Sequence, residues 1–229
     1  ELALQHGPAA LGFDLAVIGT QLDEVGVGAL VARHRRGEGA VDVEAAVSVD
    51  IGCVRMTERH LHADPPTPEE IARVEADVEA ALDRAALVVP LDRARSLIGV
   101  AGTVTTVLAL VHDLSAYDPA AIHGLVATPE EVEAMTARLL AMPRAERATL
   151  SVMHPGRVDV IGGGALVRGA IVRRTGLPVR ASETDILDGV ARSLADYGAS
   201  WGGKKGNVTL TSYDGAWQVQ LQVQESIAF

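Results

Sequence analysis

Three short apolar runs open the chain, and glycine-containing segments separate them. The runs at residues 13–18, 25–32 and 40–49 are rich in Val, Ile, Leu and Ala, and the third alternates Val with Asp and Glu. Alternation with a period of two, bounded by turn residues, is typical of antiparallel strands. The pattern therefore predicts a three-stranded meander, with a basic turn at residues 33–37, as the first part of a mixed sheet.

Helical spacing replaces strand alternation farther along the chain. Residues 67–86 begin with Thr-Pro-Glu-Glu, and residues 128–142 begin with the same four residues. Thr with Glu three positions later forms a capping box, and Pro suits the first helical position. Apolar residues then recur at three- and four-residue intervals, which predicts two helices. We predict further helices at residues 144–153 and 184–197, and a loop at residues 114–124.

The second half of the chain alternates short apolar runs with helices. Residues 96–100 lead into a long apolar helix, and residues 158–161 lead through three glycines into a helix over residues 165–175. Residues 177–181 form a third short run. Strands that alternate with helices indicate crossover connections, and the predicted fold class is therefore α/β with a mixed sheet flanked by helices.

The end of the chain has a different pattern. Residues 207–229 alternate polar and apolar positions on both sides of Asp214-Gly215, which is a strong signal for a β-hairpin. We predict a lobe over residues 1–197, in which residues 1–14 are a linker or a helix remnant. A glycine-rich joint at residues 198–206 then leads to the hairpin extension.

Composition limits the classes of partner. The chain has 229 residues, 48% of them hydrophobic and 22% charged, which is typical of a packed globular protein. Its net charge of −10 argues against non-specific nucleic-acid binding, which needs a basic surface. Cys53 is the single cysteine, so no internal disulfide forms and a reducing compartment fits. Without an apolar run of roughly 20 residues, we expect no membrane contact and a cytoplasmic location.

The turn between residues 96–100 and the following helix carries the candidate chemistry. It contains Gly99, Gly102, Thr103 and Thr105. A helix N-terminus presents unpaired N–H groups and a positive dipole end, which suit a phosphate. Glycines allow an anion to approach the backbone, and threonine hydroxyls add hydrogen bonds. The alternative is an ordinary strand-to-helix turn with Thr as its N-cap.

Other polar residues allow both a functional and a structural interpretation. Arg157 precedes the three glycines and is suited to clamp an anion, or else it pairs with Asp159. The three glycines do not complete a dinucleotide fingerprint, so we predict that they serve close packing of a helix on a strand. His60, His62 and Asp64 have metal-binding side chains, but their spacing in a loop argues against a closed site.

Residues 48–61 read S-V-D-I-G-C-V-R-M-T-E-R-H-L, and D-P-P-T follows at residues 64–67. These segments resemble the Ppx/GppA phosphatases, the family of exopolyphosphatases and guanosine pentaphosphatases. The resemblance covers about residues 41–196. It continues through G-V-A-G-T-V-T-T at residues 99–106, Tyr117-Asp118, Ile122-His123-Gly124, residues 155–166, Ser182-Glu183 and Asp188-Gly189.

The resemblance implies the second lobe of the fold shared by acetate and sugar kinases, Hsp70 and actin, which is related to ribonuclease H. It also implies Mg²⁺-dependent hydrolysis of a terminal phosphoanhydride in polyphosphate or guanosine pentaphosphate. The implied phosphate-binding residues are Gly99, Gly102, Thr103, Thr105 and Arg157.

The chain departs from the family pattern in two places. We expect the whole first lobe to be missing, together with the family's catalytic glutamate. The first phosphate loop, D-I-G-G-G-S-T-E in the family, corresponds to residues 17–24, which keep Ile18, Gly19 and Glu24. The loss of two glycines closes the approach to the backbone, and Glu24 remains as a candidate carboxylate for metal or water.

Two hypotheses therefore stay open. The chain is either the second lobe of a phosphoanhydride hydrolase, or a non-catalytic α/β fragment or engineered scaffold. We expect it to be inactive by itself, and a first lobe or a second copy in a homodimer would have to complete the site.

Overall fold

The structure is a computed structural model, and it describes residues 13–22, 25–36, 40–184, 206–213 and 216–223. The chain divides into two compact units, Glu1–Glu183 and Thr184–Phe229. The first unit contains a six-stranded sheet, and the second contains a two-stranded one. The strands of the first unit are β1 (Phe13–Leu22), β2 (Val25–Arg36), β3 (Ala40–Val49), β4 (Ala94–Val100), β5 (Val126–Ala127) and β6 (Val179–Ser182).

The six-stranded sheet is mixed, with the order β3-β2-β1-β4-β6-β5. β1, β2 and β3 pair antiparallel, whereas β4 runs parallel to both β1 and β6. The predicted meander is confirmed. The predicted basic turn at residues 33–37 is wrong, because Arg33 to Arg36 continue β2 and pair with β3.

The resemblance aligns residues 17–24 with the family's first phosphate loop, and the structure describes residues 17–22 of that segment. They belong to β1 and pair with β2 in continuous register from Val17↔Leu30 to Leu22↔Val25. A chain segment whose backbone groups are paired along a strand cannot also wrap around a phosphate. Glu24, the candidate carboxylate, lies outside the described residues.

Seven helices occur among the described residues. Their bounds are α1 (Cys53–His60), α2 (Pro68–Ala86), α3 (Gly102–Val111), α4 (Pro119–Ile122), α5 (Pro129–Ala141), α6 (Arg144–Arg147) and α7 (Ile161–Thr175). Short 3-10 turns lie at η1 (Leu91–Arg93) and η2 (Pro155–Arg157). The capping boxes of α2 and α5 form as predicted, with Thr67–Glu70 and Thr128–Glu131.

Several predicted boundaries need correction. Residues 144–153 are helical only over α6, and the predicted loop at residues 114–124 includes α4. The predicted strand at residues 158–161 is wrong: Val158 and Ile161 are buried, but they end an irregular turn and begin α7. β6 already occupies the place beside β4 in the sheet, so this apolar run packs into the core without joining the sheet. The strand predicted at residues 177–181 is β6.

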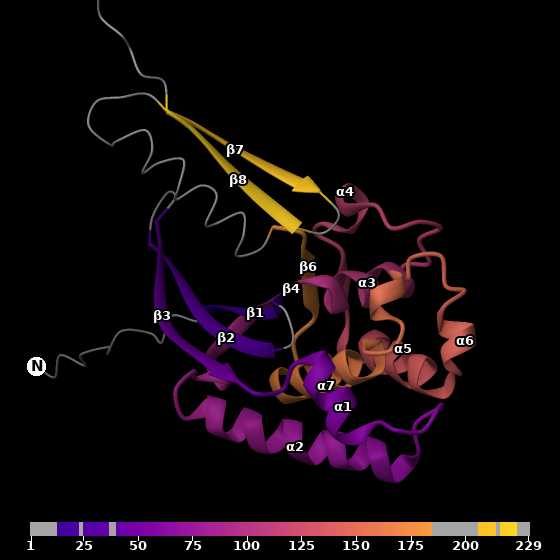
Figure 1. The fold of residues 1–229 in the computed structure, drawn as a ribbon. Coiled ribbons are helices and arrows are strands. Elements are labelled where there is room, and N and C mark those ends of the chain that lie inside the picture. The colour runs from indigo at the N-terminus through magenta and orange to yellow at the C-terminus, as the bar shows by residue number, and fades with distance from the viewer. Residues whose placement is uncertain (1–12, 23–24, 37–39, 185–205, 214–215, 224–229) are drawn as a thin grey trace, which may run out of the picture. The chain divides into compact units, whose positions relative to one another are not determined.

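α7 is the central helix of the first unit. It packs against α1, α2, α3 and α5, and Figure 1 shows α1 and α2 beside it on one side of the sheet. Every residue from Ile161 to Val172 is buried. Helices that surround α7 on several sides leave no room for large side chains at the closest contacts.

Three adjacent glycines of α7 lie at these contacts. A Cβ on Gly163 would lie 2.5 Å from Thr57 Oγ1 and 2.9 Å from the Cys53 carbonyl oxygen of α1. A Cβ on Gly164 would lie 2.6 Å from Thr103 Oγ1 of α3. The predicted close packing is therefore real, but it joins helix to helix and not helix to strand.

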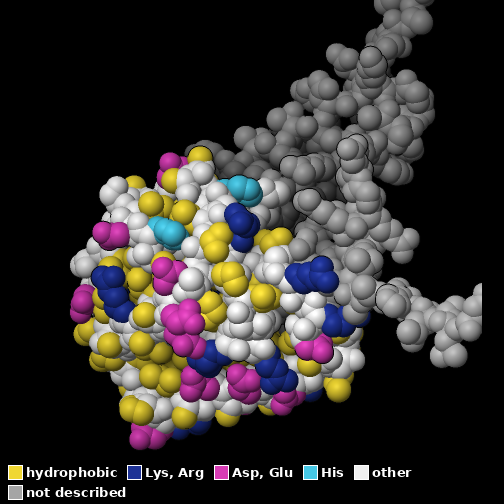
Figure 2. All heavy atoms as spheres, turned by 180° about the vertical axis from the view of Figure 1, so that it is seen from behind, with side chains coloured by type: hydrophobic (Ala, Val, Ile, Leu, Met, Phe, Trp, Pro, Cys, Tyr) yellow, Lys and Arg dark blue, Asp and Glu magenta, His cyan; other side chains and the backbone are white. Residues whose placement is uncertain are grey.

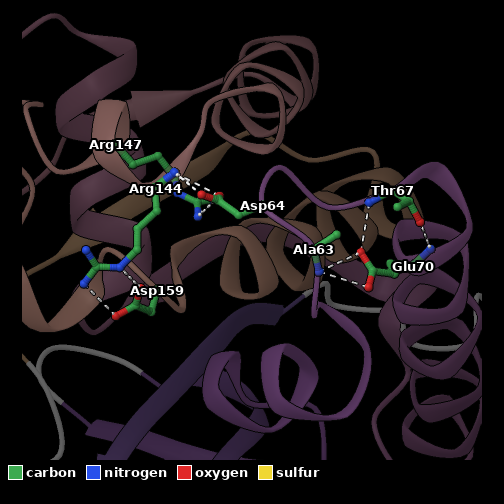
Figure 3. Close-up of polar contacts among 7 residues, drawn as sticks. All are labelled: Ala63, Asp64, Thr67, Glu70, Arg144, Arg147 and Asp159. Atoms are coloured by element: carbon green, nitrogen blue, oxygen red, sulfur yellow. Dashed lines mark hydrogen bonds and ion pairs between the residues drawn. The ribbon is translucent and has the colours of Figure 1, made fainter.

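The loop before α2 is fixed from both sides, as Figure 3 shows. The Glu70 carboxylate accepts hydrogen bonds from the backbone N–H groups of Thr67, His62 and Ala63. These bonds, that from Thr67 above all, lower the pKa of Glu70 below its usual value. On the other side, Asp64 accepts from the backbone N–H of Arg144 and from the buried guanidinium of Arg147 in α6.

The surface mixes charges of both signs. Arg173 and Arg174 at the end of α7 pair with Glu75, Glu79 and Asp83 of α2. Figure 2 shows acidic, basic and hydrophobic side chains interspersed on the face seen from behind, with no continuous basic area. No helix in the described part of the chain is both long and apolar enough to span a bilayer.

The second unit contains the predicted hairpin. β7 (Gly206–Tyr213) and β8 (Ala216–Val223) pair antiparallel, with Val208 opposite Leu221 and Leu210 opposite Val219. The register is the one that the alternating sequence predicts. Of the joint predicted at residues 198–206, Gly206 already belongs to β7, and residues 198–205 lie outside the described residues, as does the helix predicted beyond Thr184.

Gly163→Ala should destabilise the first unit by about 1–3 kcal/mol, because the new methyl group meets backbone and side-chain atoms of α1. Gly169→Ala is the matched control on the same helix, since its nearest neighbour would be the flexible end of Arg173 at 3.5 Å. That change should be neutral or stabilise the helix by up to about 1 kcal/mol. Chemical denaturation measures the free energy of unfolding of both variants. An equal change in the two would contradict the close packing of Gly163 on α1.

Candidate functional site

The turn from β4 into α3 has an unusual backbone. Ala101 is the N-cap of α3 and has φ 70° and ψ 170°, a conformation that residues with a Cβ rarely adopt. Its carbonyl accepts from the backbone N–H groups of Val104 and Thr105 and so starts the helix. The alternative of a threonine N-cap is wrong, because the cap is Ala101 and no side chain caps this helix.

The two glycines of the turn have different surroundings. A Cβ on Gly99 would lie 2.7 Å from Val104 Cγ1 and 3.1 Å from Val179 Cγ2, so Gly99 allows β4, β6 and α3 to pack closely. A Cβ on Gly102 would lie 2.3 Å from the Cζ and Nε atoms of Arg157. Gly102 thus leaves room for the guanidinium at the N-terminus of α3.

Arg157 lies at this helix N-terminus although it is 55 residues away in sequence from Gly102. Its Nη1 donates to Thr106 Oγ1 at 3.0 Å, and its Cζ lies 5.5 Å from the centre of the Tyr117 ring. A guanidinium has five N–H donors, and no carboxylate pairs with this one among the described residues. Arg157 therefore retains donors for an anion.

Asp159 does not pair with Arg157, so that alternative is wrong. Its carboxylate forms a bidentate pair with Arg144, as Figure 3 shows. The pair lowers the pKa of Asp159 through the Arg144 hydrogen bonds. Because Asp159 pairs with Arg144, the Arg157 guanidinium is available to contact α3.

The two threonines that were predicted to bind phosphate lie in different environments. Thr105 is 1% exposed, and its hydroxyl lies 2.7 Å from Tyr117 Oη. Thr103 is partly exposed in the first turn of α3, and its side chain packs over Gly164 of α7. Contact with phosphate stays a prediction for both, and the structure gives Thr105 a supporting place beneath the turn.

Tyr117 connects the turn to the end of β6. Its hydroxyl donates to Glu183 Oε1 at 2.8 Å. Burial raises the pKa of the Tyr117 phenol, and the neighbouring Glu183 carboxylate acts in the same direction. Sequence analysis assigned no site role to Thr106, Tyr117 or Glu183. Only the fold brings these residues together, although Tyr117 and Glu183 lie in segments that resemble the family.

His60, Asp64 and the cysteine have structural partners. His60 Nε2 lies 2.8 Å from Asp77 Oδ2, and Asp64 binds α6. In the part of the chain that the structure describes, no three His, Cys, Asp or Glu side chains lie together to hold a metal ion. Cys53 is partly buried at the contact between α1 and α7.

Ala101→Gly should stabilise the first unit by about 1 kcal/mol, because glycine adopts a positive φ without the strain that alanine pays there. Ala148→Gly is the control, since Ala148 has a helical φ of −66° and gains nothing from glycine. The melting temperature and the free energy of unfolding should rise in Ala101→Gly and fall in Ala148→Gly. A loss of stability in Ala101→Gly would contradict the strained conformation.

Comparison with known proteins identifies two matching family models. The model of the Ppx/GppA phosphatase family matches residues 37–181. A model for proteins of unknown function (DUF3164) matches residues 180–229, so the two matches meet close to the boundary between the two units. The hairpin accordingly lies outside the Ppx/GppA match.

Among curated proteins, exopolyphosphatase 2 from two strains of Mycobacterium tuberculosis is 48% identical over 162 residues. This alignment covers 69% of the chain and 51% of the relative, so the chain spans about half the length of the curated relatives it matches.

Solved structures show the same relation. An exopolyphosphatase-like protein is 36% identical with a TM-score of 0.74, covering 86% of this chain and 62% of that one. The Ppx/GppA phosphatase of Aquifex aeolicus is 25% identical with a TM-score of 0.68, covering 80% and 57%. The fold is thus actin-like, with a mixed sheet flanked by helices, as predicted. The chain belongs to the Ppx/GppA phosphatase family.

Proposed function

We propose that this chain provides the phosphate-binding half of a phosphoanhydride hydrolase that acts on polyphosphate or guanosine pentaphosphate. The observation that carries the proposal is the Arg157 guanidinium, which lies over Gly102 at the N-terminus of α3 without a carboxylate partner in the described residues. Family membership gives the reaction class, and the relatives named exopolyphosphatase favour polyphosphate.

The chemistry of the site suits a chain of phosphates. Backbone N–H groups of the first turn and the helix dipole attract negative charge, and Arg157 adds a bidentate donor. Gly102, Thr103 and Arg157 would contact the anion, while Gly99 and Thr105 shape the turn beneath it. These local donors must overcome a chain that carries a net charge of −10.

Mg²⁺ belongs to the proposal only through the family. The described residues provide no cluster of carboxylates that fits the ion, and a lone Glu24 would be a weak site. Mg²⁺ is commonly held by one or two carboxylates together with substrate phosphates. Such carboxylates would come from outside the described residues, for example from a first lobe.

A second candidate, a non-catalytic lobe that still binds anions, is favoured by one observation. Residues 17–22 are paired as a strand where the family has its first phosphate loop. Without that loop and an acid to activate water, phosphoryl transfer lacks most of its transition-state stabilisation. The two candidates share the anion site and differ in catalysis.

Binding of tripolyphosphate, measured by isothermal titration calorimetry, tests the shared site. Gly102→Ala displaces Arg157, and Gly102→Asp also adds a negative charge. The affinity should fall about tenfold or more for Gly102→Asp and less for Gly102→Ala. Gly156→Ala is the matched control, because its Cβ would lie at least 3.4 Å from its neighbours. Equal affinity in all four proteins would refute the proposed site.

Release of phosphate from polyphosphate with Mg²⁺ separates the two candidates. We expect the isolated chain and Gly102→Asp to show the same background rate, because neither holds a complete site. A rate for the unaltered chain that Gly102→Asp abolishes would instead show that this chain is a catalyst by itself.

A further inference from the structure

Three residues that are distant in sequence converge beside the anion site. Tyr117 precedes α4, His123 follows it, and Glu183 follows β6. Tyr117 Oη donates to the Glu183 carboxylate, and the Glu183 backbone N–H donates to His123 Nδ1 at 3.2 Å. Glu183 thus binds both ends of the α4 segment.

The backbone reinforces this connection. The N–H of Gly124 donates to the carbonyl of Ala181, and the N–H of Ala181 donates to the carbonyl of Leu125. Arg180 also donates to the Gly124 carbonyl at 2.9 Å. The segment that carries Tyr117 is therefore anchored to the strand end beside the site.

The direction of the hydrogen bonds follows from the chemistry of the groups. A carboxylate only accepts, so the single hydroxyl proton of Tyr117 goes to Glu183. The short contact between Thr105 Oγ1 and Tyr117 Oη is then donated by Thr105. Thr105 Oγ1 also lies 3.3 Å from the Gly102 carbonyl oxygen and 3.5 Å from that of Ala101, so this hydroxyl joins Tyr117 to the backbone of the first turn of α3.

The ring of Tyr117 acts on a second element. It lies 5.5 Å from Arg157 Cζ, which is a cation–π distance. The guanidinium contacts Gly102 and Thr106 of α3 and lies next to the Tyr117 ring, which belongs to a different segment. The hydroxyl of Tyr117 therefore contacts the first turn of α3, and its ring contacts Arg157.

We propose that Tyr117 is the positioning residue of this site: its hydroxyl fixes the first turn of α3 through Thr105, and its ring holds the Arg157 guanidinium over Gly102. The assignment rests on the proposed function for what the site binds. The positioning itself is a property of the protein without ligand.

Two variants separate the roles of ring and hydroxyl. Tyr117→Phe keeps the ring, and Tyr117→Leu removes both. Tripolyphosphate affinity should fall about three- to tenfold in Tyr117→Phe and further in Tyr117→Leu. Gly156→Ala, whose Cβ would lie at least 3.4 Å from its neighbours, is again the control and should leave the affinity unchanged. Circular dichroism confirms that each variant is folded.

The ligand-free chain gives an independent measurement. The ¹⁵N–¹H resonance of Arg157 Nε, assigned with Arg157→Lys, should carry a ring-current shift that Tyr117→Phe retains and Tyr117→Leu loses. The absorbance titration of tyrosine should lose a component above the usual pKa of 10.0 in Tyr117→Phe.

The outcomes distinguish the two proposals. If the unaltered chain does not bind tripolyphosphate but the Arg157 resonance shifts as expected, the proposed function fails and the positioning stands. Binding that is equal in the unaltered chain, Tyr117→Phe and Tyr117→Leu overturns the positioning role. An Arg157 resonance that is unchanged in Tyr117→Leu overturns it as well.

Discussion

The close contact of α7 with α1 and α3 is the constraint on which the first unit depends. Gly163 and Gly164 bring the helix axes near enough for Thr57 and Thr103 to touch the α7 backbone surface. Because α7 begins only four residues after Arg157, its depth in the core also determines where that arginine lies. The packing of one glycine-containing helix thus places both sides of the candidate anion site.

Ion pairs complete what the packing begins. Arg144 pairs with Asp159 and, through its backbone N–H, binds Asp64, so that the turn between η2 and α7 and the loop before α2 are both tied to α6. Exposed pairs of this kind contribute about 0–1 kcal/mol each to stability. Their larger effect here is on which groups pair. Arg144 binds Asp159, the carboxylate nearest to Arg157 in sequence, so the Arg157 guanidinium contacts the N-terminus of α3 instead.

Local patterns predicted the local features well. The capping residues of α2 and α5, the meander and the hairpin register all follow from short-range chemistry that tertiary packing does not oppose. Residues 158–161 show where this reasoning fails. Three apolar residues around Asp159 are too few to define a period, and only the sheet order shows that β6 takes the place beside β4. The same holds for Tyr117, whose partners are supplied by segments 12 and 66 residues away.

The proposed anion site and the altered first loop can be explained together. The α3 turn is supported by Thr105, Thr106, Tyr117 and Glu183, all within the second half of the first unit. These side-chain contacts do not involve residues 17–22, whose backbone pairs with β2 and, at Val17 and Ile18, with Gly99 and Val100 of β4. Under the proposed function, a change of side chains in the first loop can therefore remove one set of phosphate contacts while the contacts of Arg157 with Gly102 and Thr106 remain. Under the proposed function, anion binding and catalysis are then separable, because the side chains around the α3 turn would support the first and the first loop would support the second.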